Sequence, residues 1–340
     1  MMKFKKIRTY LFVLIALIGV YVLYILFSSN TNFDEKQKYI YLPTGSTYQN
    51  LLANLKEAQC LKSMSSFERL ADKLNLKNHV HPGKYKIENG MGNYSLVAMF
   101  RSGKQQPVKL VINKIRTKQD LIRKISKQLE ADSNELKKLF SDNNFLKQYE
   151  IDSNQIQCLI IPDTYEFKWN TDAKKTIEKL AKGSASFWSE ERVAKAKKLN
   201  MSKAQIITMA SIVEEETNKK EDKYKIASTY LNRIKLAMPL QADPTCKFAV
   251  GDFAIKRVLK IHTQVNSPYN TYKMKGLPPG PICTPSKETI DAVLDAPKTD
   301  YIYFCAREDL KGYSNFATNY QEHQANAKKY QEALNKRGIK

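Results

Sequence analysis

The chain begins with a long uninterrupted run of apolar residues. Tyr10 to Phe27 reads YLFVLIALIGVYVLYILF and contains no charged side chain. At a rise of about 1.5 Å per residue, a helix of this length nearly crosses the ~30 Å hydrocarbon layer of a membrane. The run is long for a signal peptide and lacks an obvious A-x-A exit. We therefore expect residues 10–27 to form a retained transmembrane helix.

The charges beside this run predict its orientation. Lys3, Lys5, Lys6 and Arg8 precede it, and the positive-inside rule therefore keeps residues 1–9 in the cytoplasm. The rest of the chain is then expected outside the inner (cytoplasmic) membrane, in the periplasm. No cysteine follows the run closely enough to suggest a lipoprotein.

The pattern after the apolar run predicts a small α+β module over residues 38–150. A short strand is followed by an amphipathic helix, whose leucines recur at helical spacing after a cap at Ser46 or Thr47. A second helix and a strand after Pro82-Gly83 complete a β-α-α-β order. Another strand, VKLVINKI, and further helices follow before residue 150.

The β-α-α-β order resembles LysM-type modules, which bind the N-acetylglucosamine chains of cell-wall glycans. The resemblance lies in the pattern of elements and in no diagnostic residue. A spacer that holds a second domain away from the membrane is the alternative interpretation.

From about residue 156 to residue 340 the pattern predicts a second mixed α+β domain. Its clearest helix covers residues 202–218, with Ser202 as cap. The stripe expected to face the core consists of Ile206, Met209, Ala210, Val213 and Thr217. A proline-rich loop, a helix capped by Ser286, an aromatic strand and a polar terminal helix follow. The expected fold class is therefore α+β with one transmembrane helix.

The charge of the chain points to an acidic partner. Lys and Arg number 56 against 34 Asp and Glu, a formal net charge of +22. Nucleic acid, an anionic membrane surface and an acidic polymer all fit this balance. The outward topology and the lack of any recognisable nucleic-acid module in the sequence disfavour nucleic acid. The membrane and an acidic polymer therefore remain as expected partners.

The cysteines and histidines do not suggest a metal or cofactor site. Neither type is arranged in metal-ligand pairs, and no CxxC occurs. Because the number of cysteines is odd, at least one is expected to be free or bonded to another chain. We expect most of them to serve as small buried hydrophobes. They are Cys60, Cys158, Cys246, Cys283 and Cys305.

Three consecutive glutamates lie near the end of the 202–218 helix. At about 100° per residue, Glu215 projects nearly opposite the apolar stripe and is expected in solvent, whereas Glu214 and Glu216 flank the stripe. A carboxyl held against apolar neighbours, at the negative end of a helix dipole, has a raised pKa. Such an acid can protonate a leaving oxygen. The helical wheel favours Glu216 over Glu214 without deciding between them.

Four sequence blocks in a fixed order resemble a known family. They are MASIVEEET, NRIKLAMPLQADPT, SPYNTYKMKGLPPGPICTPS and KTDYIYFCA. They look like the blocks of the endolytic murein transglycosylases, the YceG-like or MltG family, and IPDTYEF at 161–167 resembles the block upstream. The resemblance covers essentially the whole exported chain.

The resemblance implies a lyase that cleaves the β-1,4 bond between N-acetylmuramic acid and N-acetylglucosamine in nascent glycan strands. Such enzymes form 1,6-anhydro-muramyl ends and limit or terminate strand elongation. That chemistry needs one acid that then acts as a base, unlike the two carboxylates of ordinary glycosidases. The family's catalytic glutamate falls on Glu216. The middle position of the motif, often a lysine in the family, is Glu215 here.

The resemblance also implies substrate-binding residues. Gln241, in LQADPT, resembles the glutamine that contacts the saccharide, and Asn270, in PYNTY, resembles the tyrosine-asparagine group that orients the muramyl sugar. Tyr269 and Tyr272 offer flat apolar faces for sugar rings or simply pack in their loop. Asp243 accepts sugar hydroxyls or holds the following turn.

Two other functions stay open from the sequence. One is a non-catalytic, membrane-tethered glycan-binding or scaffold protein of the cell-wall synthesis machinery. The other is a hydrolase that uses water and leaves reducing ends. Peptidoglycan glycan strands are the expected substrate or partner in each case, with peptidoglycan synthases as possible further partners.

Overall fold

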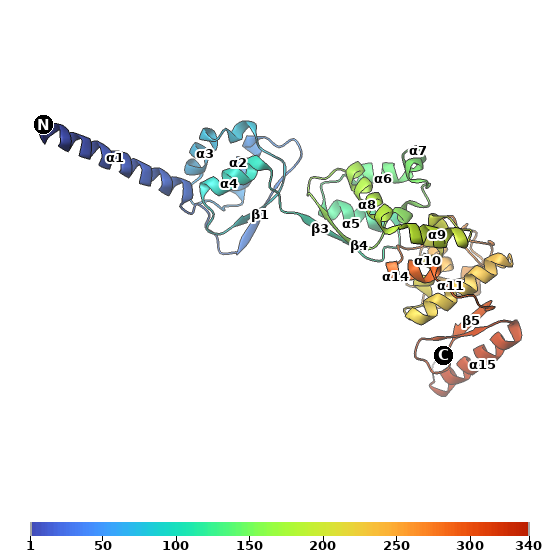
Figure 1. Cartoon of the computed structure of the whole chain (residues 1–340). Helices are drawn as coiled ribbons and strands as arrows, with labels where there is room; N and C mark the ends of the chain where they lie inside the picture. The colour runs from blue at the N-terminus through green and yellow to red at the C-terminus, as the bar shows by residue number, and fades with distance from the viewer. Residues whose placement is uncertain (1, 339–340) are drawn as a thin grey trace. The chain divides into compact units, whose positions relative to one another are not determined.

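The computed structural model describes residues 2–338, which form a mixed α+β protein with two compact units (Figure 1). The N-terminal unit comprises residues up to Leu110 together with Lys127–Ala131 and Glu166–Asp172. The C-terminal unit comprises Val111–Ser126, Asp132–Tyr165 and the chain from Ala173 onward. The chain therefore passes between the units several times.

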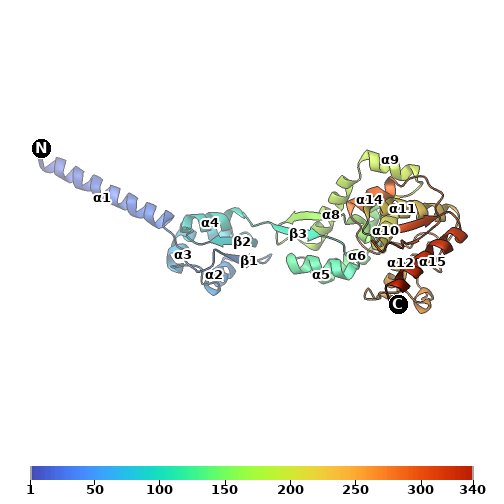
Figure 2. The same cartoon turned by 90° about the horizontal axis from the view of Figure 1, so that it is seen from below.

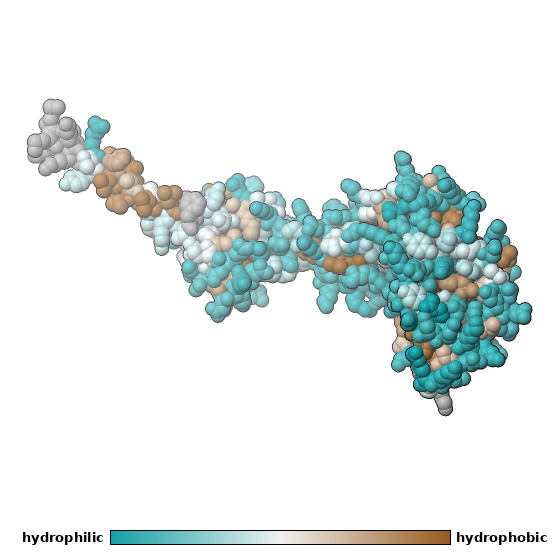
Figure 3. All heavy atoms as spheres, turned by 60° about the horizontal axis from the view of Figure 1, so that its bottom comes forward, coloured by the Kyte–Doolittle hydropathy of each residue, from teal (hydrophilic) through white to brown (hydrophobic). Residues whose placement is uncertain are grey.

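The first helix, α1 (Met2–Phe27), carries the apolar run. Within it, Ile7–Tyr24 is long and apolar enough to cross a membrane. The side chains of this stretch are exposed, and they form the brown band along the helix in Figure 3. A helix that exposes so much apolar surface is expected to be covered by lipid. These properties fit the predicted single membrane anchor.

The N-terminal unit has the predicted β-α-α-β order. Strands β1 (Gln37–Leu42) and β2 (Gly83–Glu88) pair antiparallel, with Gln37 opposite Glu88 and Leu42 opposite Gly83. Thr47 caps the first intervening helix, and a capping box with Asn50 completes the cap. The other elements are α2 (Tyr48–Glu57), α3 (Met64–Lys73), η1 (Leu76–Asn78) and α4 (Asn93–Ser102).

The core of the N-terminal unit lies between the sheet and its helices. Leu42, Leu51, Phe67, Tyr85 and Phe100 are all fully buried there. Each large apolar side chain buried in this way stabilises the fold by about 1.5–3 kcal/mol. The alternation of buried and exposed positions along β1 and β2 follows from packing only one face of the sheet.

The C-terminal unit is mostly helical (Figure 2), and the four strands that follow β1 and β2 are short. The strand pairs are β3 with β4, at the boundary between the units, and β5 with β6. The strands are β3 (Val108–Ile112), β4 (Asp163–Phe167), β5 (Tyr303–Ala306) and β6 (Ser314–Ala317). The helices are α5 (Lys118–Gln128), α6 (Ser133–Ser141), α7 (Asn143–Leu146), η2 (Lys147–Tyr149), η3 (Ile156–Leu159), α8 (Ala173–Phe187), α9 (Glu190–Lys198), α10 (Lys203–Glu216), α11 (Lys220–Lys235), α12 (Asp243–Val250), α13 (Lys260–Thr263), α14 (Lys287–Leu294) and α15 (Tyr320–Lys336).

Helix α10 is the central element of the C-terminal unit. Ser202 caps it as predicted, and Gln205 completes a capping box. All eight residues from Ile206 to Val213 are buried, because α9, α11, α12 and α14 pack around the helix. The predicted stripe is therefore buried except for Thr217, which follows the helix and is partly exposed, and the positions between the buried members are buried too. A helix that is apolar on all sides is a core helix and not an amphipathic one.

The predicted boundary between the domains differs from the observed one. The sequence assigned 38–150 to the first module, whereas 111–126 and 132–150 belong to the C-terminal unit. Hydrogen bonds explain part of this placement. The Thr284 amide donates to the Ile115 carbonyl at 2.9 Å, and the Ile115 amide donates to Thr284 Oγ1 at 2.8 Å. These bonds bind the segment after β3 to the proline-rich loop.

All five cysteines are free in the part of the chain that the structure describes. Cys60, Cys158, Cys246 and Cys283 are buried among apolar side chains, and Cys305 is partly exposed. The expectation that most cysteines serve as small buried hydrophobes is therefore confirmed.

Candidate functional site

The three glutamates at the end of α10 have three different environments. The helix is fixed by its surroundings, so successive side chains are directed toward different neighbours. Glu214, Glu215 and Glu216 are all only partly exposed. Their partners distinguish their possible roles.

Glu214 is bound to neighbouring helices. Its Oε2 accepts hydrogen bonds from Ser286 Oγ at 2.9 Å and from Thr289 Oγ1. Lys223 Nζ of α11 lies 3.4 Å from the same oxygen. Glu214 thus ties α10 to α11 and to the first turn of α14, and this set of partners indicates a structural role.

Glu215 is held between two cations. Lys114 Nζ lies 3.0 Å from Oε1, and Arg116 Nη2 lies 2.9 Å from Oε2. Only 14% of its side chain is exposed, so the prediction that Glu215 faces solvent is wrong. Burial raises the pKa of this carboxyl, but the hydrogen bonds from Arg116 and Lys114 outweigh burial and lower the pKa overall. Glu215 is therefore a carboxylate, unsuited to donate a proton.

Glu216 combines partial burial with a short hydrogen bond from a tyrosine. Tyr230 Oη, from α11, donates to Glu216 Oε1 at 2.6 Å. Burial and, to a lesser extent, the nearby Asp243 raise the pKa of Glu216 to about 7, against the opposing effects of Tyr230, Lys247 and Arg233. Such a carboxyl exchanges its proton near neutral pH, which is the property required of a group that acts first as an acid and then as a base.

Asp243 and Tyr272 lie close to Glu216. Tyr272 Oη donates to Asp243 Oδ1 at 2.6 Å, and both residues interact electrostatically with Glu216. Burial and the bond to Asp243 raise the pKa of Tyr272, so the phenol stays protonated. The structure therefore brings together Glu216, Asp243 and Tyr272 from three of the four sequence blocks.

Gln241 precedes α12 in an unusual backbone conformation. Its φ is +51°, which is uncommon for a residue with a Cβ and costs about 1 kcal/mol. A backbone hydrogen bond holds it there, from the Gln241 amide to the Thr271 carbonyl at 3.0 Å. The side chain is exposed and so remains accessible to a ligand. Backbone strain of this kind clusters at functional sites.

Asn270 faces the interior of its loop. Its side chain is fully buried, and Nδ2 donates to the carbonyls of Thr263 at 2.9 Å and Val265 at 2.8 Å. Its Oδ1 accepts from the Tyr272 amide at 3.1 Å and from Cys246 Sγ at 3.3 Å. The amide group thus uses its hydrogen-bonding capacity within the protein. In this geometry Asn270 shapes the loop that presents Tyr272 and has no free group for a sugar.

Tyr269 packs beside this loop. Its ring centroid lies 4.7 Å from that of Phe248, and the residue is partly buried. Burial raises the pKa of Tyr269 to about 12. Of the two interpretations offered by the sequence, packing describes the observed contacts of this side chain.

Of the residues of α11 near the site, Tyr230 was missed in the sequence. Tyr230 shares the buried face of the helix with Ile226, four residues earlier, and this spacing was the available signal. Arg233 donates to the carbonyls of Leu240 at 2.8 Å and Ile302 at 2.6 Å. It thereby holds the segment before Gln241 against β5.

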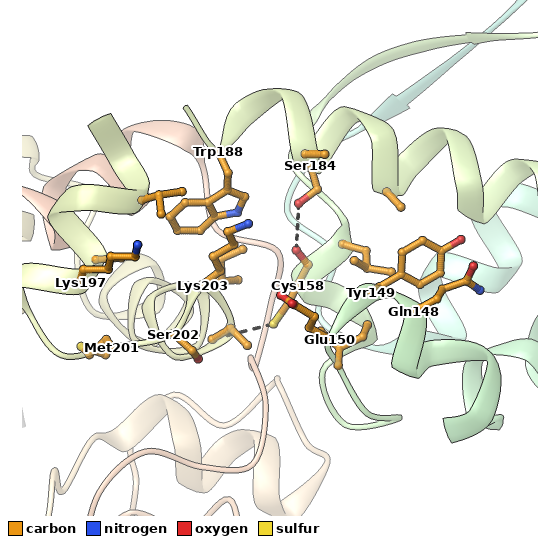
Figure 4. A pocket seen from close by; sticks show the side chains of 18 residues that line it. Gln148, Tyr149, Glu150, Cys158, Ser184, Trp188, Lys197, Met201, Ser202 and Lys203 are labelled. Carbon is orange, nitrogen blue, oxygen red and sulfur yellow. Dashed lines mark hydrogen bonds between the residues drawn. The ribbon is translucent and has the colours of Figure 1, made fainter. Parts of the chain in front are cut away.

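A cavity of the C-terminal unit lies at the opposite end of α10 (Figure 4). Its volume is about 530 Å³, and its wall includes Trp188, Met201 and Ile207. Ser184 Oγ donates to the Cys158 carbonyl at 3.4 Å within this wall. Ser202 and Glu216 are separated by about 20 Å along a helix of this rise. The cavity is therefore separate from the group of residues around Glu216.

Comparisons with known proteins agree with the sequence blocks. The model of the YceG-like family matches residues 40–329. The "Endolytic murein transglycosylase" of Bacillus subtilis (strain 168) is 30% identical over 317 residues, which cover 88% of this chain and 86% of that protein. The protein of the same name from Streptococcus pneumoniae serotype 2 (strain D39) is 31% identical over 180 residues, 51% of this chain and 32% of that protein.

A solved structure shares the fold. The crystal structure of a yceG-like protein from Listeria monocytogenes matches with a TM-score of 0.56 and 27% sequence identity. The match covers 86% of this chain and 99% of that one.

Proposed function

The chain belongs to the YceG-like family, whose curated relatives are endolytic murein transglycosylases, and we propose that it cuts peptidoglycan strands by forming 1,6-anhydro-muramyl ends. The bond cleaved is the β-1,4 linkage between N-acetylmuramic acid and N-acetylglucosamine. One observation carries the proposal: Glu216 is a partly buried carboxyl with a pKa near neutrality, beside the Tyr230 donor and Asp243.

Glu216 performs both proton transfers in this mechanism. In its protonated form it donates to the glycosidic oxygen as the bond from C1 to that oxygen breaks. The resulting carboxylate then accepts the proton of the sugar's own C6 hydroxyl, whose oxygen bonds to C1 and closes the anhydro ring. Glu216 ends protonated, ready for the next cut. A pKa of about 7 suits both steps, because neither protonation state is strongly favoured at neutral pH.

The residues around Glu216 have complementary roles. Tyr230 holds Oε1 and leaves the second carboxyl oxygen to face the substrate. Asp243, joined to Tyr272, offers an acceptor for sugar hydroxyls, and Tyr272 offers an aromatic face. Gln241 supplies an exposed amide for the saccharide. Asn270 and Tyr269 position the loop of Tyr272 from within.

The N-terminal unit and α1 locate this activity. We assign α1 as a single-pass anchor in the cytoplasmic membrane, with the enzyme on its outer side. The β-α-α-β order and antiparallel pairing of β1 and β2 support a LysM-like unit that binds or approaches glycan. An enzyme anchored in this way cuts nascent strands near the membrane, where peptidoglycan synthases work, and so limits their length.

Digestion of purified glycan strands tests the assignment of the acid. The wild type, Glu216→Gln and the matched Glu214→Gln variant are incubated with the same strands, and products are identified by mass spectrometry. We expect Glu216→Gln to lose at least about 100-fold in rate, since proton transfer by a positioned acid contributes that much. Glu214→Gln should keep most of its activity if it folds with wild-type circular dichroism.

Three outcomes would contradict the proposal. Equal release of anhydro ends by Glu216→Gln and wild type would remove Glu216 from the chemistry. Reducing ends in place of anhydro ends would indicate a hydrolase. No cleavage by the wild type would favour a scaffold or glycan-binding protein.

A further inference from the structure

A small cavity adjoins the residues around Glu216. Its volume is about 50 Å³, and it is lined by Arg116, Glu215, Pro244, Lys247, Phe248, Phe253 and Ile282. A space of this size holds more than one water molecule, and therefore also a group as small as a carboxylate. Its lining comes from the end of α10, from α12 and from the segment after β3.

Arg116 is fixed on one side of this cavity. Its guanidinium carbon lies 5.3 Å from the centre of the Phe253 ring, and Nη2 donates to Glu215 at 2.9 Å. Its Nε is buried and makes no hydrogen bond among the residues that the structure describes. A guanidinium has five N–H donors in a planar fork, so Arg116 keeps donors for an anionic ligand.

Lys247 lines another side of the cavity. It is partly exposed and makes no ion pair within 4.0 Å in the described part of the chain. The two cations of the lining, with Lys114 on the other oxygen of Glu215, outnumber the two carboxylates of Glu215 and of Asp243, which precedes Pro244. The local charge is therefore positive while Glu216 is protonated.

This charge opposes the chemistry of the neighbouring acid. Lys247 lowers the pKa of Glu216. An acid that must donate a proton at neutral pH benefits instead from a raised pKa. Acid catalysis alone therefore does not explain a cation at this position. A substrate that brings its own negative charge does explain it.

We propose that the cavity between Arg116 and Lys247 is a subsite for a carboxylate carried by the muramyl residue of the substrate. The inference rests on the proposed function, because it concerns the same cleft. The carboxylate is either the lactyl group of a sugar without a stem peptide or an acid of the stem peptide. In both cases the ligand is a small anion beside an apolar ring wall, which matches the lining of Arg116, Lys247, Phe248 and Phe253.

Occupation of this subsite would couple binding to catalysis. A bound carboxylate offsets the charge of Lys247, so that Glu216 holds its proton more firmly while a substrate is present. The acid would then be best prepared for proton donation in the complex with acidic strands.

Kinetics with matched substrates test the subsite. Four preparations are compared, all with acetylated amines: strands with intact stems, strands stripped of stems by an amidase, and each of these after its carboxyls are converted to methylamides. The enzymes are the full-length wild type, Lys247→Met, Lys247→Arg and the control Lys198→Met, which removes one exposed lysine of α9. The readout is KM for each substrate at pH 6, with kcat measured separately.

We expect the KM of the wild type to be about tenfold higher for neutralised strands than for untreated strands, because neutralisation removes one charge-assisted hydrogen bond. In Lys247→Met the ratio of the KM for neutralised strands to the KM for untreated strands should fall to near one. Lys247→Arg should restore the ratio of the wild type. Lys198→Met should behave as wild type. Sensitivity confined to stripped strands would identify the lactyl group, and sensitivity of intact strands would identify the stem.

A wild-type KM that does not depend on the carboxyls would overturn the subsite, as would a ratio unchanged in Lys247→Met. Both results need an enzyme that cleaves, so they differ from failure of the proposed function, in which no preparation is cut. Thermal unfolding of each variant separates loss of binding from loss of folding.

Discussion

The hydrogen bond between Tyr230 and Glu216 gives the sharpest kinetic prediction. Tyr230→Phe removes the hydroxyl that donates to Glu216 Oε1 at 2.6 Å and keeps the ring, which packs 5.8 Å from that of Phe304. The hydroxyl stabilises the charged carboxylate, so it lowers the pKa that burial raises. Its removal should therefore raise the pKa of Glu216.

The size of the shift follows from the strength of such bonds. A hydrogen bond to a charged group contributes about 1.5–3 kcal/mol, and one pKa unit corresponds to about 1.4 kcal/mol. The pKa of Glu216, about 7 in the wild type, should rise by roughly one to two units in Tyr230→Phe. The acid would stay protonated to higher pH and would become a weaker donor.

The assay is kcat/KM for anhydro-end formation between pH 5 and 10. Because the protonated carboxyl starts the reaction, the alkaline limb reports its pKa in the free enzyme. In Tyr230→Phe this limb should move to higher pH, with a lower plateau. Tyr224→Phe, elsewhere on α11, is the matched control and should leave the limb in place. An unmoved limb, or one displaced to lower pH, would refute the reasoning.

Three further predictions concern stability. In urea unfolding, Glu216→Gln should stabilise the protein by up to about 3 kcal/mol at pH 9 and little at pH 4. The reason is that the pKa of this carboxyl rises from 4.5 to about 7 on folding, so its contribution to stability is lost as the pH rises through that window. Equal effects at both pH values would contradict this. Ser202→Ala should cost about 1 kcal/mol in the same assay by removing the cap of α10, whereas no loss would show that packing alone fixes the helix start. Asn270→Ala should cost about 1–3 kcal/mol, because the carbonyls of Thr263 and Val265 lose their donor, and a neutral change would disprove its role in the loop.

The local elements were predictable because their signals are local. The cap at Ser202, the short strand β1 and the order β-α-α-β each depend on neighbouring residues, and the structure contains them all. The blocks of the second domain likewise contained Glu216, Asp243 and Tyr272, which the fold brings together.

The environments of the glutamates were not predictable from a helical wheel. A wheel assumes one buried face, but α10 is surrounded, and the partners of Glu215 lie about a hundred positions earlier in the chain. The position of Glu215 between Lys114 and Arg116 therefore has no local signal. The same holds for Asn270, whose burial depends on how its loop closes over Cys246.

The most direct test of the central claim is cleavage of glycan strands in water enriched in ¹⁸O. If Glu216 directs attack by the sugar's own C6 hydroxyl, the new muramyl ends should be anhydro ends without ¹⁸O, and Glu216→Gln should form none. Reducing muramyl ends that carry ¹⁸O would contradict this account, because they would show that water and not the C6 hydroxyl attacks C1.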